Sequence, residues 1–287
     1  MRIIALMTVR NEEKYLEHCI RHLVSQGVEI CLIDNGSTDR TREIASAWLG
    51  KGVMRIEEIP FNGLFELEKI LKNEERLSAE IQADWFMHHD ADEIREAPAG
   101  FRNLAEGVAD ADRQGYNAIN FDEFVFVPTG EDEDYESSDY VATMKYYYFF
   151  EPAPLRRVNL WKNAGQVIDL VSSGGHSVRF AGRRVYPLPF VMRHYILLSR
   201  AHAERKFGVR IYPQQELARK WHLDRARHGK QGVRFPGKQE MKYFTSSDRM
   251  DRSAPKLTHL IFPDKPSILR HVIRMARRVK AKLALNA

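Results

Sequence analysis

Cysteine is scarce in this chain, which has only Cys19 and Cys31 among its 287 residues. Both lie in segments with an apolar pattern, and two cysteines cannot form the dense disulfide framework of a small secreted domain. We therefore expect both to be reduced residues of the core. Long apolar runs are also missing, since no window approaches 18 consecutive apolar residues. This excludes a transmembrane helix of ordinary length.

Two well-known nucleotide-binding signatures are missing as well. The chain has neither the GxGxxG fingerprint of dinucleotide-binding folds nor the GxxxxGK[ST] pattern of a P-loop. The N-terminal run "MRIIALMTV" is not followed by a small-residue cleavage site. It therefore predicts a first strand rather than a signal peptide, and we expect a cytoplasmic protein.

Charge is unevenly distributed behind the net value of +5. Residues 1–150 hold 15 Lys and Arg against 30 Asp and Glu, whereas residues 151–287 hold 29 against 9. The acidic half could hold a cation, and the basic half could face a phosphate, an acidic acceptor, nucleic acid or a membrane surface. Two ordinary solvated surfaces would explain the division equally well.

The first ninety residues alternate short apolar runs with helical patterns. Strands are predicted at "RIIALMTV", "EICLIDN", "VMRIEEI" and "WFMHH", and helices at "EEKYLEHCIRHLVSQG", "STDRTREIASAWLG" and "FELEKILKNEERLSAEIQ". This order predicts an α/β fold with a mostly parallel central sheet flanked by helices. In such sheets, ligands bind beyond the carboxyl ends of the strands.

Polar clusters follow three of these predicted strands. Residues 8–13 are "TVRNEE", residues 34–39 are "DNGSTD" and residues 90–93 are "DADE". We expect all three clusters to lie along one rim of the sheet. Three carboxylates at the end of a buried strand repel one another, and a divalent cation is the usual group that offsets this repulsion.

Together, the three clusters resemble the nucleotide-sugar-binding half of the GT-A glycosyltransferases, and of family 2 in particular. The resemblance covers roughly residues 1–125 and rests on three motifs in order. It implies a GT-A catalytic domain over residues 1–200, with a nucleotide-sugar and metal half at 1–125, an acceptor half at 126–200 and a basic helical extension at 201–287. It also implies that a sugar moves, with inversion, from a UDP- or GDP-sugar to a glycan or glycolipid, as in surface polysaccharide assembly.

The resemblance assigns roles to individual residues. Mg²⁺ or Mn²⁺ would be held by Asp90 and Asp92 and would neutralise the charge of the diphosphate leaving group. Glu93 would orient the acceptor or bind the metal ion through water. An acidic residue that stabilises the start of a helix would explain the presence of Glu93 equally well. The nucleotide would contact residues of the first two clusters and the first acid of the third, namely Thr8, Arg10, Asn11, Glu12, Asp34, Asn35, Asp39 and Asp90.

Past residue 125, one further stretch carries a resemblance. "RHYILLSRAHAERKF" resembles an HY-x₃-S segment of related GT-A enzymes, which implies that His194 completes the metal or diphosphate site. His176 in "SSGGHSV" is the second candidate, because the two glycines would allow a ligand close to the backbone. The alternative for His194 is a structural histidine in the core, and the alternative for His176 is a plain hairpin turn.

An inverting transferase also needs a base that deprotonates the acceptor hydroxyl. Glu123 or Asp122, at the end of the predicted strand "NFDEFVFVP", is the candidate, and strand alternation turns only one of them toward the cleft. Asp169 is a third candidate. The aromatic residues 146–150 and Trp161 could stack on a sugar, although their alternation fits core packing better.

The C-terminal residues 268–283 have the pattern of a basic amphipathic helix. This helix would either pack on the domain or make peripheral contact with the inner face of a membrane. Two other function classes are a phosphohydrolase with Asp90 as the nucleophile and a non-enzymatic module whose basic half binds nucleic acid. The DxD motif follows the fourth strand rather than the first, and no nucleic-acid-binding motif is present, so we favour neither.

Overall fold

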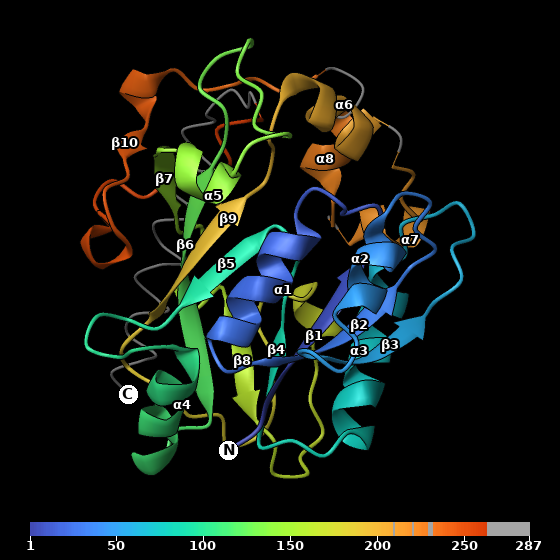
Figure 1. The fold of residues 1–287 in the computed structure, drawn as a ribbon, viewed down its shortest axis with the longest axis vertical. Coiled ribbons are helices and arrows are strands. Elements are labelled where there is room, and N and C mark those ends of the chain that lie inside the picture. Colours follow the sequence, from blue (N-terminus) through green and yellow to red (C-terminus); the bar gives the residue numbers. More distant parts are fainter. Residues whose placement is uncertain (209, 220, 229–231, 263–287) are drawn as a thin grey trace.

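The computed structural model describes residues 1–208, 210–219, 221–228 and 232–262. A ten-stranded sheet runs through this part of the chain (Figure 1). Its strands are β1 Ile3–Val9, β2 Glu29–Asp34, β3 Val53–Glu58, β4 Trp85–His88, β5 Glu93–Glu96, β6 Ala118–Phe126, β7 Tyr146–Phe150, β8 Val158–Lys162, β9 Phe190–Tyr195 and β10 Lys242–Tyr243.

Eight α-helices lie within the described residues. They are α1 Leu16–Ser25, α2 Thr41–Ala47, α3 Leu67–Glu80, α4 Leu104–Arg113, α5 Tyr140–Thr143, α6 Arg200–Gly208, α7 Gln214–Ala218 and α8 Leu223–His228. Three short 3₁₀ helices, η1 Val171–Ser173, η2 Lys238–Glu240 and η3 Ser247–Arg249, complete the regular structure of this part of the chain.

The strand order is β3-β2-β1-β4-β8-β6-β7-β10, and β9 pairs with both β6 and β5. β1 is parallel to β2 and β4, and β2 is parallel to β3, as the alternating pattern of the first ninety residues predicts. Beyond β4 the sheet becomes mixed, because β8 runs antiparallel to β4 and β6 runs antiparallel to β8. The predicted α/β class is confirmed.

Alternation along β1 divides the core between the two faces of the sheet. Its odd-numbered residues, such as Ala5 and Met7, pack with α1, whereas Ile4 and Leu6 pack with Leu71 of α3. Side chains of a strand point to opposite faces in turn, so a fully apolar strand needs a helix on each side. Both cysteines are buried and free, which confirms that they are reduced core residues.

Helix α1 shows how its sequence produces its packing. Its buried residues, Leu16, Cys19, Ile20 and Leu23, are spaced three and four apart and form one apolar stripe. The chain leaves the helix at Gly27, whose φ of +77° lies in the left-handed region that glycine adopts without a steric penalty. This turn feeds β2 and brings its carboxyl end beside that of β1.

Three predicted site residues fall in different places from those expected. Glu93 does not lie on the rim, because the turn after β4 ends with Asp92 and Glu93 begins the buried strand β5. Asp122 and Glu123 do not end a strand either, since β6 continues to Phe126. Strand alternation nevertheless separates them, with Glu123 2% exposed in the interior and Asp122 paired with Arg252.

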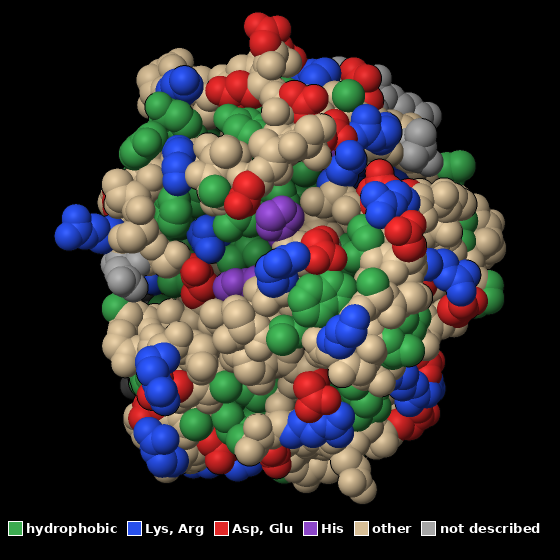
Figure 2. All heavy atoms as spheres, viewed as in Figure 1, with side chains coloured by type: hydrophobic (Ala, Val, Ile, Leu, Met, Phe, Trp, Pro, Cys, Tyr) green, Lys and Arg blue, Asp and Glu red, His purple; other side chains and the backbone are tan. Residues whose placement is uncertain are grey.

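The described part of the chain after β9 contributes α6, α7 and α8 near the carboxyl edge of the sheet (Figure 1). The basic helix expected at residues 268–283 lies outside the described residues. Within the described residues, no helix is both long and apolar enough to cross a membrane. On the face seen in Figure 2, acidic and basic side chains are interspersed rather than gathered into two fields.

Gly107 provides a test of the packing between α4 and the sheet. A Cβ atom at this position would lie 2.7 Å from Cζ of Phe190 and 3.2 Å from Cβ of Ala97. The Phe190 ring cannot move aside easily, because it packs edge-on against Phe121 and Tyr186. Alanine improves helix propensity by about 1 kcal/mol, whereas overpacking costs about 1–3 kcal/mol.

We therefore expect Gly107→Ala to lower the free energy of unfolding by up to about 2 kcal/mol, measured by urea or thermal unfolding. Gly130→Ala is the matched control, because its Cβ would meet only Cγ of Glu133, at 4.0 Å. The control should stay within about 0.5 kcal/mol of the wild type. A Gly107→Ala protein that is more stable than the wild type would show that α4 packs less tightly than described.

Candidate active site

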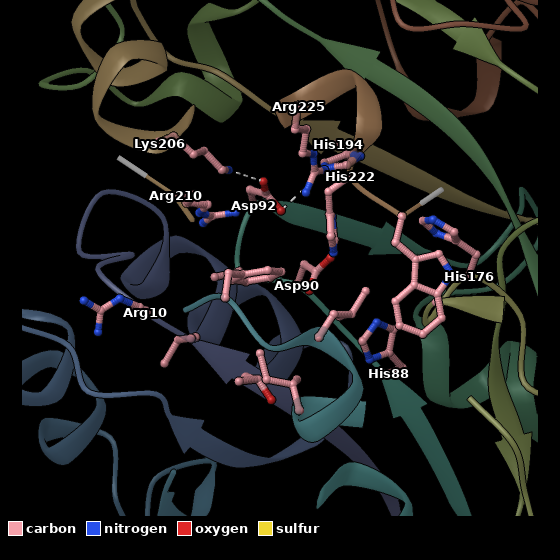
Figure 3. Close-up of a pocket in the computed structure, with 18 of the residues that line it drawn as sticks. Arg10, His88, Asp90, Asp92, His176, His194, Lys206, Arg210, His222 and Arg225 are labelled. Carbon is pink, nitrogen blue, oxygen red and sulfur yellow. Dashed lines mark hydrogen bonds and ion pairs between the residues drawn. The ribbon is translucent and has the colours of Figure 1, made fainter. Parts of the chain in front are cut away.

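A cavity of about 450 Å³ opens at the carboxyl edge of β1, β2 and β4. Side chains from both halves of the chain line it, as Figure 3 shows. The first half contributes, among others, Thr8, Arg10, Glu12, Asn35, Glu74, His88, Asp90 and Asp92. The second half contributes, among others, Arg156, Arg157, His176, His194, Lys206, Arg210, Trp221, His222, Arg225 and His259.

At one end of the cavity, Arg10 connects the first two sequence clusters. Its guanidinium donates hydrogen bonds to the backbone oxygens of Asn35, at 2.9 Å, and of Gly36. The same group lies 3.3 Å from the ring centroid of Phe61. Asn11 adds a second link, because its side-chain oxygen accepts a hydrogen bond from the backbone N–H of Thr38 at 2.8 Å. The loops after β1 and β2 are thus one connected structure.

The acids of these loops have different surroundings. Asp34 is 1% exposed and accepts hydrogen bonds from the backbone N–H of Ser37, and it does not line the cavity. Asp39 accepts hydrogen bonds from the backbone N–H groups of Glu13 and Thr41, so it fixes the start of α2. Glu12 does line the cavity, and burial raises its pKa to about 7 although Lys206 opposes the shift.

The turn between β4 and β5 presents the DxD pair to the cavity. Asp90 lines the cavity and is exposed, and among the described side chains none forms an ion pair with its carboxylate. Asp92 accepts a hydrogen bond from Nζ of Lys206 at 2.6 Å, and Nε2 of His194 lies 3.5 Å from its other oxygen. Burial would raise the pKa of Asp92, but Lys206 and His194 hold it well below its usual value.

His194 lies between two carboxylates. Its Nδ1 is 2.7 Å from Oε1 of Glu123, and its Nε2 faces Asp92. Burial alone would lower the pKa of His194, but the charges of Asp92 and Glu123 outweigh it and raise the pKa to about 9. The imidazole is therefore positively charged near neutral pH in the absence of a bound cation.

Glu123 also binds Arg157, and this contact leads to His176. Nε and Nη2 of Arg157 donate to the two oxygens of Glu123 at 2.7 and 3.0 Å. Nη1 of the same arginine lies 2.7 Å from Nδ1 of His176. Burial would raise the pKa of Glu123, but Arg157 and His194 hold it well below its usual value.

His88 belongs to a separate buried pair. Its Nδ1 lies 2.5 Å from one oxygen of Glu74, and the hydroxyl of Thr8 donates to the other oxygen at 2.9 Å. Burial lowers the pKa of His88, but Glu74 outweighs this effect and raises it to about 9. Its neighbour His89 is fully buried and points away into the core. Strand alternation thus sends one of the two histidines to the cavity.

Several predicted residues do not line the cavity. Glu93 is buried against Arg95 at 2.6 Å, and Asp122 pairs with Arg252 at 2.5 Å. Asp169 accepts a hydrogen bond from the backbone N–H of Ser172 and likewise lies outside the cavity lining. Most of the aromatic residues considered for sugar stacking are buried in the core, namely Tyr147, Tyr148, Phe149, Phe150 and Trp161.

The structure adds lining residues that sequence reasoning missed. Lys206 and Arg210 bring positive charge to the DxD end, and Arg210 lies 3.8 Å from Glu12. Trp221 and His222 contribute aromatic rings between α7 and α8. The only sequence signal was the excess of basic residues after residue 150, because no short motif marks these four positions.

A divalent cation fits the donor atoms at the DxD end. Among the described residues, no group of three or more His, Cys, Asp and Glu is already assembled for a metal ion. The chemistry is nevertheless suitable, because Asp90 and one oxygen of Asp92 are hard donors and Nε2 of His194 faces that same oxygen. Glu123 holds the other ring nitrogen, as carboxylates commonly do behind metal-binding histidines.

The sequence comparison finds a family model that is similar to the first part of the chain. Residues 4–62 match the family model described as glycosyl transferase family 2. This segment includes β1, β2 and β3 and the first two polar clusters of the cavity. No curated protein matches the chain.

Solved structures to which this chain is similar include TarS from S. aureus, which is 13% identical, with a TM-score of 0.43 over 68% of this chain and 37% of that chain. TarS 1-349 in complex with UDP is 14% identical, with a TM-score of 0.44 over 73% of this chain and 63% of that chain. Glucosyl-3-phosphoglycerate synthase from Mycobacterium tuberculosis, with Mn²⁺, UDP and glucosyl-3-phosphoglycerate, is 22% identical, with a TM-score of 0.30 over 43% of this chain and 44% of that chain.

This chain therefore spans less than two thirds of the length of each of these relatives. The family match covers the strands that build the carboxyl edge, and the α/β sheet places the cavity at that edge. Residues 4–62 are thus similar to glycosyl transferase family 2, and the cavity lies at the carboxyl ends of strands in this segment.

Proposed function

We propose that this protein transfers a sugar from a nucleoside diphosphate donor, a UDP- or GDP-sugar, to an acceptor hydroxyl, with inversion and with Mn²⁺ or Mg²⁺. The observation that carries the proposal is the meeting of Asp90, Asp92 and His194 with Lys206 and Arg210 in one cavity at the strand ends. Carboxylates and cationic side chains of this kind are what a diphosphate and its metal ion require.

The nucleoside is proposed to lie over the ends of β1 and β2. Arg10 and Asn35 line the cavity there, and the connected loops give the surface a fixed shape. Thr8 and Glu12 line the same part of the cavity, whereas Asn11 links the two loops and Asp34 and Asp39 hold their turns. An acid that organises a turn acts on nucleotide binding through the backbone it positions.

The diphosphate is proposed to lie beside the DxD pair. A bound divalent cation would polarise the diphosphate and neutralise the charge that develops on it. Asp90, Asp92 and His194 would hold that cation, while Lys206 and Arg210 face the same region. As the acceptor oxygen bonds to the anomeric carbon, the bond from that carbon to the diphosphate breaks, and a general base accepts the hydroxyl proton.

Glu123 is better suited to positioning than to base catalysis. A general base works best with a pKa near the working pH, whereas Arg157 and His194 keep the pKa of Glu123 well below its usual value despite burial. Its two oxygens are already used by those two residues. We propose that Glu123 fixes the orientation of His194 and that neither Asp122 nor Glu93, which lie outside the cavity, contacts the acceptor.

The acceptor is proposed to be a glycan or glycolipid in a biosynthetic assembly, and the protein to work in the cytoplasm. Two free cysteines agree with a reducing compartment. The division into a catalytic domain at residues 1–200 and an extension at 201–287 is also a proposal. Lys206 of the extension reaches Asp92 of the catalytic part, so the two would function as one site.

Metal dependence is the first test of this function. We expect UDP or GDP to bind with Mn²⁺ at least about tenfold more tightly than with EDTA, measured by calorimetric titration. Asp92→Asn and Asp90→Asn should each remove most of that difference. Asp132→Asn changes an exposed acid outside the cavity and should behave as wild type. Equal nucleotide affinity with Mn²⁺ and with EDTA would eliminate the metal role.

The pH dependence of cation binding tests His194. A metal-bound imidazole must be neutral, and the metal-free ring has a pKa raised to about 9. Protons therefore compete with the cation below pH 9, so affinity for Mg²⁺ with UDP should rise up to about tenfold per unit between about pH 7 and 8.5. His194→Ala should bind more weakly and lose this slope. A wild-type slope in that variant would mean that His194 does not hold the cation.

A further inference from the structure

The end of the cavity opposite Arg10 has its own set of residues. Strand order places β8 on the far side of β4 from β1 and β2. Because β8 is antiparallel to β4, its start lies at the carboxyl edge, and Arg156 and Arg157 immediately precede it. Figure 3 shows His176 and Arg10 on opposite sides of the cavity, with Asp90 and Asp92 between them. We call this region, formed by Arg156, Arg157, His176, His88 and Trp221, the β8 end.

Two guanidinium groups face the same imidazole at the β8 end. Nη2 of Arg156 lies 3.1 Å from Nε2 of His176, and Nη1 of Arg157 lies 2.7 Å from Nδ1. Burial and the two arginines lower the pKa of His176 well below its usual value, so the ring is neutral. A neutral imidazole accepts a hydrogen bond at only one nitrogen. One of the two arginine contacts therefore brings two donors together.

The charges around His176 are strongly unequal. Those that act most strongly on it are the guanidinium groups of Arg156, Arg157 and Arg225, against the carboxylate of Glu123. The carboxylate of Glu123 also pairs with the cationic ring of His194, so its negative charge is divided between several cationic groups. Arg156 and Arg225 both line the cavity. Arg156, Arg225 and His176 are only half-buried, and three guanidinium groups around one neutral ring attract an anion from solution.

The backbone near these arginines forms a closely packed glycine turn against His88 and Trp221. Gly174 and Gly175 have φ values of +65° and +80°, which residues other than glycine rarely adopt. A Cβ at Gly175 would lie 3.0 Å from Nε2 of His88, and one at Gly174 would lie 3.5 Å from the ring of Trp221. The Gly174–Gly175 turn is fixed further by Asn159, which donates to the oxygen of Gly175 at 2.7 Å.

The position of the β8 end in the sheet indicates which substrate reaches it. Asn35 follows β2, Arg10 follows β1, Asp90 follows β4 and Arg157 precedes β8. A donor with its nucleoside over β1 and β2 and its diphosphate at Asp90 and Asp92 would direct its sugar toward β8. The acceptor must approach that sugar from beyond the diphosphate, so its contacts fall at the β8 end.

We propose that the β8 end binds a phosphate or carboxylate group carried by the sugar acceptor, with Arg156 as its main contact and Arg225, which lines the same cavity nearer to His194, as a second. This proposal rests on the proposed transferase function and narrows the acceptor to an anionic compound. Arg157 acts differently, because Glu123 already occupies two of its donors, and it holds His176 in place. Trp221 supplies an apolar wall for the rest of the acceptor.

Inorganic phosphate is the probe for this site. It is titrated by calorimetry, without metal or nucleotide, into the wild type and the variants Arg156→Gln, Arg225→Gln, Arg10→Gln and Arg102→Gln. We expect the first two variants to bind phosphate about tenfold more weakly, because each removes a charge-assisted contact. Arg10→Gln, at the other end of the cavity, and Arg102→Gln, at an exposed position, should bind as wild type. Arg156→Lys should restore much of the binding, and thermal unfolding verifies that each variant is folded.

The outcomes separate this proposal from the donor function. Phosphate binding that persists with saturating UDP and Mg²⁺ supports a second anion site, whereas competition with UDP together with weakening by Arg10→Gln would overturn it. Equal binding by the wild type, Arg156→Gln and Arg225→Gln would also overturn it. If phosphate binds through Arg156 but no nucleotide binds, the donor function fails and the anion site stands without its assignment to a sugar acceptor.

A carboxylate on the donor sugar is the other source of the same chemistry. UDP-glucuronate and UDP-glucose are therefore titrated with Mg²⁺ into the wild type and Arg156→Gln. We expect Arg156→Gln to affect the two nucleotides equally. A selective loss of UDP-glucuronate affinity of about tenfold would assign the anion to the donor and overturn the acceptor proposal.

Discussion

The buried carboxylate of Glu123 is the group on which the floor of the cavity depends. It receives two hydrogen bonds from Arg157 and faces Nδ1 of His194, so one side chain of β6 holds residues from the start of β8 and from β9. Loss of one partner from a buried ion pair typically costs about 3–5 kcal/mol, because the remaining charge is left uncompensated. Here the loss would leave a guanidinium and an imidazolium together. The orientation of His194 toward Asp92, and of Arg157 toward His176, follows from this one carboxylate.

The two oppositely charged halves of the chain meet at a second ion pair, between Lys206 and Asp92. Helix α6, which carries Lys206, is also tied to the acidic segment before α5, because Arg200 binds Glu131 and Arg205 binds Glu136. The charge asymmetry of the sequence is therefore used for internal pairing at the cavity and its border. An exposed pair contributes little to stability, but the partly buried Lys206–Asp92 pair fixes where the basic residues enter the site.

Charged neighbours divide the buried histidines of the cavity into two charge states. His88 and His194 each have a carboxylate partner, which outweighs desolvation and raises the pKa to about 9. Burial and two nearby arginines lower the pKa of His222 to about 3. The pKa of His176 is lowered in the same way. One residue type thus supplies positive charge at the carboxylates and neutral rings among the arginines. Because these environments differ, we propose a cation at one place in the cavity and an anion at another.

Sequence alone determined the parts of this protein that depend on local pattern. The apolar run of β1, the helical spacing of α1 and the polar residues after β1, β2 and β4 are short-range features, and parallel strands bring their carboxyl ends to one edge.

Tertiary structure decided the rest. Glu123 meets His194 across 71 residues through the pairing of β6 with β9, and Lys206 meets Asp92 across 114 residues through the docking of α6. Glu93, next to the DxD pair in sequence, is buried because β5 begins there and pairs with β9. Such contacts depend on strand register and helix placement, which no short motif encodes.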